Sequence, residues 1–400
     1  MTRKGLLIIL DGLGDQPVPA LGNRTPLEAA YTPHLDRVAN QAACSLVDTT
    51  VPGLPVATEV GVAVLLGLGR DEAKNVVRGP IEAAGVGVAL MPGDLAIHAN
   101  FATLRDEADG RIKVLDRRAG RIREGTLELA AAASGLDLGD GIRADVHPAS
   151  QHRVVVRFTG PGLSADVSDT DPGAASDTML VNPCIGHEAT ARAVNRFVAL
   201  AREKLGNHAV NRDRRARGLP EANGLITRSA GVATKWEGRV RGAVDRAALV
   251  AAERTVIGMG RLLGYHAFVD ARFTALPDTD LEAKREVARH ALKNHDLVVL
   301  HIKGTDICAH EKDADGKRRF IERVDEMMAP LFETDHVIAV TADHGTSSLT
   351  GVHIPDPVPA LLRIPGETAP GCHMFSETSC CGTGVQTAEQ FLDTLLAALR

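Results

Sequence analysis

The chain has 400 residues, which is longer than one hydrophobic core usually supports, so two domains are expected. Its formal net charge of −6 argues against general affinity for nucleic acid or anionic membranes and leaves a small molecule as the expected partner. The six cysteines contain no CxxC pair and lack the density of a small secreted scaffold, which predicts reduced thiols in a cytoplasmic protein. The apolar run near the N-terminus is too short for a membrane span or a signal segment.

That run, residues 5–10, is the first predicted element. It is continuously apolar and is followed at once by Asp11 and Gly12. Short apolar runs of this kind are typical of strands that are buried on both faces of a sheet. Asp11 is therefore expected at the carboxyl end of a central strand.

The next informative element is an apolar helix predicted to begin near Thr58, within residues 57–66. A hydroxyl at a helix N-terminus gains from the positive end of the dipole, and a neighbouring metal ion lowers its pKa towards that of an alkoxide. Thr58 is thus a candidate nucleophile. Taken alone, it is better explained by the simpler role of a helix cap, and only the metal-ligand residues elsewhere in the chain favour the nucleophile.

Between residues 94 and 181 the pattern changes. Gly-rich and Asp-rich turns interrupt segments 111–114 and 152–158, which alternate in polarity with a period near two. This pattern predicts a smaller inserted β-rich domain at 94–181, with residues 1–93 and 182–400 forming the core domain.

Two more apolar runs, 297–302 and 336–341, each lead into a polar cluster, and helix-like stretches such as 280–293 separate them. The alternation of strands and helices favours an α/β fold with a parallel sheet. Ligands of such sheets bind beyond the carboxyl ends of the strands. The polar residues that follow the runs are therefore expected to share one site with Asp11.

The polar clusters contain residues of the metal-ligand type. Asp306 and His310 are four residues apart and so share one face of a helix, whereas Asp343 and His344 directly follow the run 336–341. His353 stands in a proline-rich loop nine residues later. Each has an ordinary alternative: a helix cap for Asp306, an Asx turn for Asp343 and a solvated loop histidine for His353.

Together with Asp11, these clusters supply three carboxylates and three imidazoles, a set suited to Mn²⁺, Zn²⁺ or Mg²⁺. Two such ions a few ångströms apart can hold the attacking and leaving oxygens of an in-line phosphoryl displacement. The sequence therefore predicts a site with two divalent metal ions.

Several blocks of the chain resemble the archaeal-type, cofactor-independent phosphoglycerate mutases of the alkaline phosphatase superfamily. Besides the metal-ligand clusters, the blocks are 25–30, 32–36, 78–83, 100–103, 116–121, 168–172, 218–223 and 278–284. The resemblance covers most of the chain. It implies an alkaline-phosphatase-like, mostly parallel sheet flanked by helices, with a smaller inserted α+β domain that covers the metal site.

The resemblance also implies roles for the candidate residues. One ion would be held by Asp11, Thr58, Asp343 and His344, and the other by Asp306, His310 and His353, with Thr58 bridging the two. The implied reaction interconverts 3-phosphoglycerate and 2-phosphoglycerate through a phosphothreonine intermediate on Thr58.

Basic residues would hold the substrate, because the planar guanidinium of arginine grips carboxylate and phosphate oxygens with two parallel hydrogen bonds. The first candidates are Arg117, Arg118 and Arg121, followed by Arg78, Arg212 and Lys303. For any single arginine, a solvated basic surface is the alternative.

Two departures from the family pattern leave other functions open. The family carries serine in a Pro-Gly-Ser-Asp block, whereas here four residues separate Gly53 from Thr58, and segment 67–71 replaces an aromatic-Asp-Pro turn. The β-methyl of threonine restricts the side chain and crowds the line of attack. The alternatives are a hydrolase of phosphate esters, nucleotide-type diesters or phosphonates with the same site, and a non-catalytic binding protein; the oligomeric state stays open.

Overall fold

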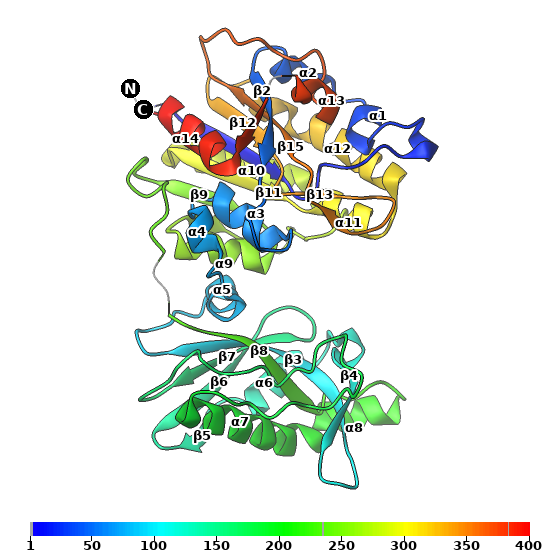
Figure 1. Cartoon of the computed structure of the whole chain (residues 1–400), viewed down its shortest axis with the longest axis vertical. Helices are drawn as coiled ribbons and strands as arrows, with labels where there is room; N and C mark the ends of the chain where they lie inside the picture. Colours follow the sequence, from blue (N-terminus) through cyan, green and yellow to red (C-terminus); the bar gives the residue numbers. More distant parts are fainter. Residues whose placement is uncertain (1–2, 234–235, 383) are drawn as a thin grey trace. The chain divides into compact units, whose positions relative to one another are not determined.

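The computed structural model of the chain describes residues 3–233, 236–382 and 384–400. It divides into two compact units: a core unit, Met1–Val76 with Trp236–Arg400, and an inserted unit, Val77–Lys235 (Figure 1). Within the described residues, no helix is both long and apolar enough to cross a membrane.

The core unit is built on an eight-stranded sheet. In spatial order its strands are β10 (His266–Phe268), β9 (Ala247–Val250), β11 (Leu297–Ile302), β1 (Gly5–Leu10), β12 (Val337–Thr341), β15 (Val358–Arg363), β2 (Ala43–Asp48) and β16 (Val385–Thr387). The first five run parallel to one another, and β15 alone is antiparallel to its neighbours. The prediction of a mostly parallel α/β sheet is confirmed.

Strand β1 lies between β11 and β12, and all six of its residues are buried. This agrees with the sequence, since a strand covered on both faces has no position for a polar side chain. The predicted strands at 297–302 and 336–341 correspond to β11 and β12.

Helices flank this sheet in two groups (Figure 1). One contains α1 (Pro26–Ala29), α2 (Pro33–Ala39), α10 (Leu281–Asn294), α11 (Gly304–His310) and α12 (Ala314–Phe332), and the other contains α3 (Thr58–Leu65), α4 (Arg70–Ala73), α9 (Arg254–Leu262) and α14 (Ala388–Ala398). In the first group the other helices contact α12, and in the second they contact α3. The smaller elements are η1 (Pro19–Leu21), α13 (Glu377–Cys381) and the antiparallel pair β13 (Gly345–Thr346) and β14 (His353–Ile354).

The inserted unit has an antiparallel sheet in the order β4-β3-β7-β6-β5, with β8 also paired to β3. Its strands are β3 (Leu95–Asp106), β4 (Ile112–Asp116), β5 (Leu136–Gly139), β6 (Ile142–Pro148), β7 (Arg153–Thr159) and β8 (Gly224–Val232). Its helices are α5 (Arg78–Gly85), η2 (Ala119–Arg121), α6 (Thr126–Ala132), α7 (Glu188–Gly206) and α8 (Ala209–Ala216).

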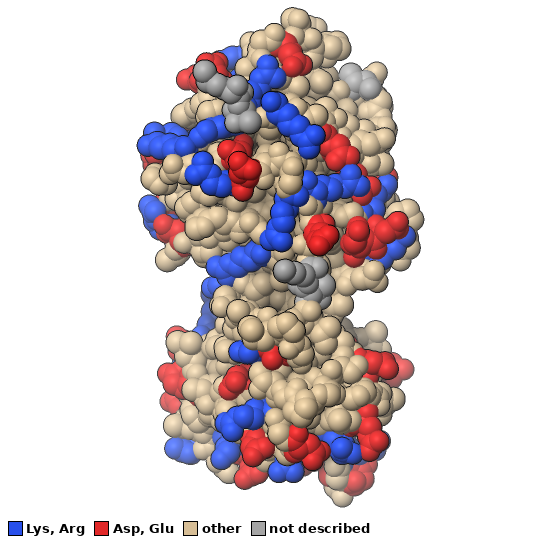
Figure 2. Space-filling model, turned by 90° about the vertical axis from the view of Figure 1, so that its left-hand side faces the viewer, with Lys and Arg blue, Asp and Glu red and all other residues tan. Residues whose placement is uncertain are grey.

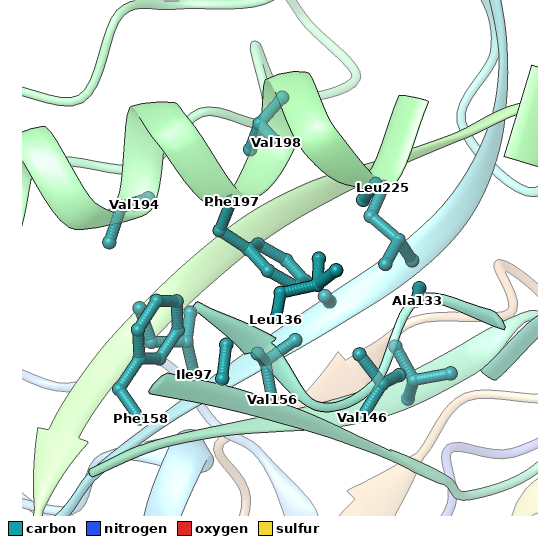
Figure 3. Close-up of a cluster of buried hydrophobic side chains, with 14 of the residues drawn as sticks. Ile97, Ala133, Leu136, Val146, Val156, Phe158, Val194, Phe197, Val198 and Leu225 are labelled. Atoms are coloured by element: carbon teal, nitrogen blue, oxygen red, sulfur yellow. The ribbon is translucent and has the colours of Figure 1, made fainter. Parts of the chain in front are cut away.

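This unit is wider than the predicted 94–181. Strand β8 belongs to it because it pairs with β3 from Leu95↔Val232 to Ala102↔Gly224. Helix α7 belongs to it because its apolar face covers the same sheet, where the rings of Phe197 and Phe158 meet edge to face with centroids 5.5 Å apart (Figure 3). Helix α7 is amphipathic, but its sequence pattern did not indicate which sheet it covers.

Candidate active site

The candidate site lies at the carboxyl ends of three adjacent parallel strands of the core unit. Asp11 follows β1, Lys303 follows β11, and Asp343 comes two residues after β12. Because β1 pairs with both neighbours in parallel register, the segments that follow the three strands all leave the sheet at the same edge. The backbone N–H of Asp11 donates to Ile302 O at 2.9 Å, which keeps the segment after β1 beside the end of β11.

Thr58 reaches this edge from the first residue of α3. Ala57 holds the N-cap position, so the Thr58 hydroxyl does not cap the helix; its Oγ1 lies 3.1 Å from His344 Nε2. Helix α3 can approach closely because of Gly61, where an added Cβ would lie only 2.1 Å from Asp343 O. A glycine at this position therefore allows Thr58 to lie beside the polar residues that follow β12.

Two histidines and Asp306 form one cluster. The Nε2 atoms of His310 and His353 are 3.1 Å apart, and they lie 3.3 and 3.5 Å from Asp306 Oδ1. Each ring places Nδ1 against a backbone carbonyl, Gly351 O at 2.8 Å and Val56 O at 2.9 Å. Rings that donate their Nδ1–H in this way direct the Nε2 lone pairs toward each other, as metal-binding histidines do.

A second cluster surrounds His344. Its Nδ1 lies 3.2 Å from Gly345 O, and its Nε2 lies 3.5 Å from Asp11 Oδ1 and 3.4 Å from Asp343 Oδ2. Burial lowers the pKa of His344 to about 4, so its ring is neutral and its Nε2 can act as a ligand or as a proton acceptor.

The Lys303 ammonium lies between the two clusters. It donates to Asp11 Oδ2 and Asp306 Oδ2, both at 2.9 Å, and to Thr58 Oγ1 at 3.4 Å. Burial disfavours its charge, but these carboxylates outweigh that effect and raise its pKa. Sequence analysis placed Lys303 among the substrate ligands, whereas the structure pairs it with the candidate metal ligands.

The carboxylates carry more negative charge than one lysine can balance. Burial, together with repulsion from Asp11, raises the pKa of Asp343 well above its usual range. Asp11 Oδ1 and Asp343 Oδ2 are buried and have no hydrogen-bond partner among the described residues. Buried carboxylate oxygens without partners are costly unless cations neutralise them, so the residues present fit divalent metal ions.

Sequence analysis missed two residues of this site. His301 in β11 has its Nε2 3.1 Å from Asp11 Oδ2, and its signal was that it is the one polar residue of a fully buried strand. Thr346 donates through Oγ1 to Asp306 Oδ1 at 2.8 Å and so orients that carboxylate. In sequence it is one more polar residue after β12 and carries no distinguishing signal.

The predicted substrate arginines all lie in the inserted unit. Arg117 forms a bidentate pair with Asp171, with both N···O distances 2.7 Å, and Arg78 pairs with Glu82 at 3.0 Å. Three others, Arg118, Arg121 and Arg212, are exposed. Basic side chains stand beside acidic ones over the face shown in Figure 2, so exposure alone does not mark a substrate ligand.

Comparison with known proteins identifies relatives along nearly the whole chain. A family model described as "2,3-bisphosphoglycerate-independent phosphoglycerate mutase" matches residues 39–211. A protein of that name from Ignicoccus hospitalis is 38% identical over 371 residues, which cover 90% of this chain and 89% of the relative. Another, from Archaeoglobus fulgidus, is 40% identical over 368 residues, which cover 89% and 88%.

Solved structures agree. The cofactor-independent phosphoglycerate mutase of Thermoplasma acidophilum aligns with a TM-score of 0.74 at 31% identity and covers 100% of both chains. A protein from Pyrococcus horikoshii aligns with a TM-score of 0.82 at 30% identity and covers 100% of this chain and 98% of its own. These relatives set aside the alternative of a non-catalytic binding protein: the chain is a phosphotransferase or mutase enzyme and belongs to the 2,3-bisphosphoglycerate-independent phosphoglycerate mutase family.

Proposed function

We propose that this enzyme interconverts 3-phosphoglycerate and 2-phosphoglycerate by metal-dependent phosphoryl transfer, with Thr58 as the residue that carries the phosphoryl group. The observation behind the proposal is the position of the Thr58 hydroxyl, 3.1 Å from His344 Nε2 and 3.4 Å from Lys303 Nζ among buried carboxylates. The names of the relatives support the choice of substrate.

Seven residues would hold two divalent ions. We assign Asp306, His310 and His353 to one ion and Asp11, Thr58, Asp343 and His344 to the other. When bound, Mn²⁺, Zn²⁺ or Mg²⁺ would polarise the phosphoryl oxygens and lower the pKa of a nearby hydroxyl.

The chain's own groups prepare Thr58 for attack. Because Nε2 of His344 is assigned to the ion, the group that would act on Thr58 directly is the Lys303 ammonium, which donates to Oγ1 and favours the negative charge of an alkoxide. Thr58 also begins α3, whose N-terminal dipole favours negative charge there.

The reaction then has two transfers. The bond between phosphorus and one ester oxygen of the substrate breaks as a bond to Thr58 Oγ1 forms, and the glycerate that remains takes the proton that the Thr58 hydroxyl gives up. After the glycerate reorients, its other hydroxyl attacks the phosphothreonine, and the proton of that hydroxyl returns to Thr58 Oγ1 as the phosphoryl group leaves. Arg117, Arg118 and Arg121, with Arg78 and Arg212, stay the proposed ligands of the substrate's carboxylate and phosphate.

Turnover of 3-phosphoglycerate by the metal-loaded enzyme tests this proposal. We expect 2-phosphoglycerate to form, Thr58→Val to lower the rate by roughly 10³-fold or more, and Thr58→Ser, which keeps the hydroxyl, to remain within about tenfold of wild type. Wild-type activity in Thr58→Val would overturn the role of Thr58. Release of inorganic phosphate without formation of 2-phosphoglycerate would show that the enzyme is a hydrolase and not a mutase.

A further inference from the structure

Outside the candidate active site, the core unit brings together three cysteines that are far apart in sequence. Cys44 lies in β2, Cys372 precedes α13, and Cys380 lies within α13. All three are buried, and their Sγ atoms lie within 4.8 Å of one another. We call this group the thiol cluster.

The backbone fixes the first two members. Cys44 is paired with Leu361 by the register of β2 and β15. The N–H of Cys372 donates to Ala39 O at the end of α2, at 3.1 Å. The preceding Gly371 passes so close to α2 that an added Cβ would lie 2.3 Å from Asn40 O. Main-chain contacts therefore fix the backbone segments that carry these two sulfurs.

Helix α13 fixes the third member. The N–H of Cys380 donates to Ser376 O at 3.0 Å, and the Ser376 side chain caps the helix by accepting from Ser379 N at 3.2 Å. Glu377, in the first turn of the same helix, accepts from Thr25 Oγ1 at 2.8 Å. Helix α13 is thus held at both its cap and its first turn, which leaves Cys380 facing the other two thiols.

The three sulfurs lie against one another and against backbone carbonyl oxygens. The sulfur contacts with backbone oxygens are weak: Cys44 Sγ lies 3.6 Å from Ala39 O, and Cys372 Sγ lies 3.3 Å from Ser379 O. Thiolate, rather than thiol, is the form of cysteine that binds metal ions.

We propose that Cys44, Cys372 and Cys380 bind a soft, thiophilic cation, Zn²⁺ or Cu⁺, at a site separate from the phosphoryl-transfer centre. A metal–sulfur bond of about 2.3 Å places two sulfurs of one ion roughly 3.8 Å apart, which the cluster allows with little movement. Thiolates favour Cu⁺ and Zn²⁺ over Mn²⁺ and Mg²⁺, whereas the oxygen and nitrogen donors of the other site accept Mn²⁺, Mg²⁺ or Zn²⁺, so Cu⁺ and the hard ions separate the two sites.

Binding has two physical consequences. Each thiol that is still protonated releases one proton to solvent as its sulfur binds, so affinity falls as the pH falls. The ion also ties β2, α13 and the segment next to α2 together across a long stretch of sequence. It therefore stabilises the folded core unit by a free energy that grows with the logarithm of its affinity.

Spectroscopic titration tests the proposal. The reduced, metal-free full chain is titrated anaerobically with Co²⁺, Cd²⁺ and Cu⁺, and sulfur-to-metal charge-transfer absorption is recorded. We expect a band whose intensity corresponds to one thiolate-bound ion per chain, and Zn²⁺ should displace the Co²⁺ band. Oxygen and nitrogen donors give no such band, so the result is independent of the proposed mutase function.

Single variants assign the band to residues. Cys44→Ser, Cys372→Ser and Cys380→Ser should each remove it, whereas Cys184→Ser and Cys308→Ser, at buried cysteines outside the cluster, should keep it. Elemental analysis of freshly purified wild type and Cys44→Ser then identifies the ion: the metal, zinc or copper, that is present in wild type and missing from the variant is the one bound by the thiol cluster. If a variant fails to fold, protection of the three wild-type thiols from alkylation by added metal, mapped by mass spectrometry, answers the same question.

Three results would overturn the proposal. The first is no charge-transfer band with any of the three ions, and the second is a band that the cluster variants leave unchanged. The third is a disulfide within the cluster in freshly isolated protein, which would make the group a redox pair.

Discussion

Replacement of Gly61 by alanine tests whether the close packing of α3 positions Thr58. The added Cβ would lie 2.1 Å from Asp343 O, whereas Cβ atoms are essentially never found closer than 3.0 Å to another heavy atom. Helix α3 and the Asp343 segment must therefore separate by about 0.9 Å. Thr58 lies three residues earlier on the same helix and moves with it. A misplacement of about 1 Å at a reacting group can lower kcat by roughly 100-fold.

Gly61→Ala should change the stability of the fold less than the activity, and two opposing contributions set that change. Overpacking costs about 1–3 kcal/mol, and the better helix propensity of alanine offsets up to about 1 kcal/mol of that. Gly61→Ala should therefore stay folded, with near-native thermal unfolding, while conversion of 3-phosphoglycerate falls steeply. Gly206→Ala is the matched control, because at the end of α7 no described atom lies within 4 Å of the added Cβ. A folded Gly61→Ala enzyme with more than half of wild-type kcat would refute the reasoning.

Three further predictions concern stability and metal dependence. Lys317→Met breaks a fully buried ion pair with Asp15, 2.9 Å long, and should lower the free energy of unfolding in urea by about 3–5 kcal/mol; a loss below about 1 kcal/mol would contradict this. Its control, Arg319→Met at an exposed ion pair with Asp315, should change that energy by less than about 0.5 kcal/mol. Burial raises the pKa of Glu377 from 4.5 to about 7, so the folded chain keeps a proton that the unfolded chain has lost, and stability falls as pH rises through that window. In Glu377→Gln this decrease in the free energy of unfolding should disappear, as measured by urea unfolding at several pH values. A pH profile identical to that of wild type would count against a buried neutral carboxyl at Glu377. Removal of divalent ions with a chelator should abolish turnover and lower the Tm, and added Mn²⁺ should restore both; full activity in chelator would exclude the metal assignment.

The central sheet was predictable because burial on both faces leaves a distinct sequence pattern. Strands β1, β11 and β12 are apolar runs except for His301 and Thr341, and each leads into a polar cluster. Parallel pairing then brings the carboxyl ends to one edge, so the convergence of Asp11, Asp306 and Asp343 followed from topology alone.

Features that depend on long-range contacts were not predictable. The amphipathic pattern of α7 indicates an apolar face but does not say that this face covers the sheet of the inserted unit. Lys303 was predicted among the substrate ligands as a basic residue, whereas its contacts with Asp11 and Asp306 form only when the strand ends converge. No short sequence motif marks the thiol cluster, because its members are brought together by the register of β2 with β15 and by the approach of Cys372 to α2.

Trapping the covalent intermediate tests the central claim most directly. Metal-loaded wild-type enzyme is mixed with isotopically labelled 3-phosphoglycerate, quenched within one turnover and mapped by mass spectrometry, with Thr58→Val treated in parallel. The proposed mechanism predicts a labelled phosphothreonine at Thr58 that forms and decays at rates compatible with kcat and is absent from the variant. Label on another residue, or wild-type turnover with no phosphorylated enzyme, would contradict it.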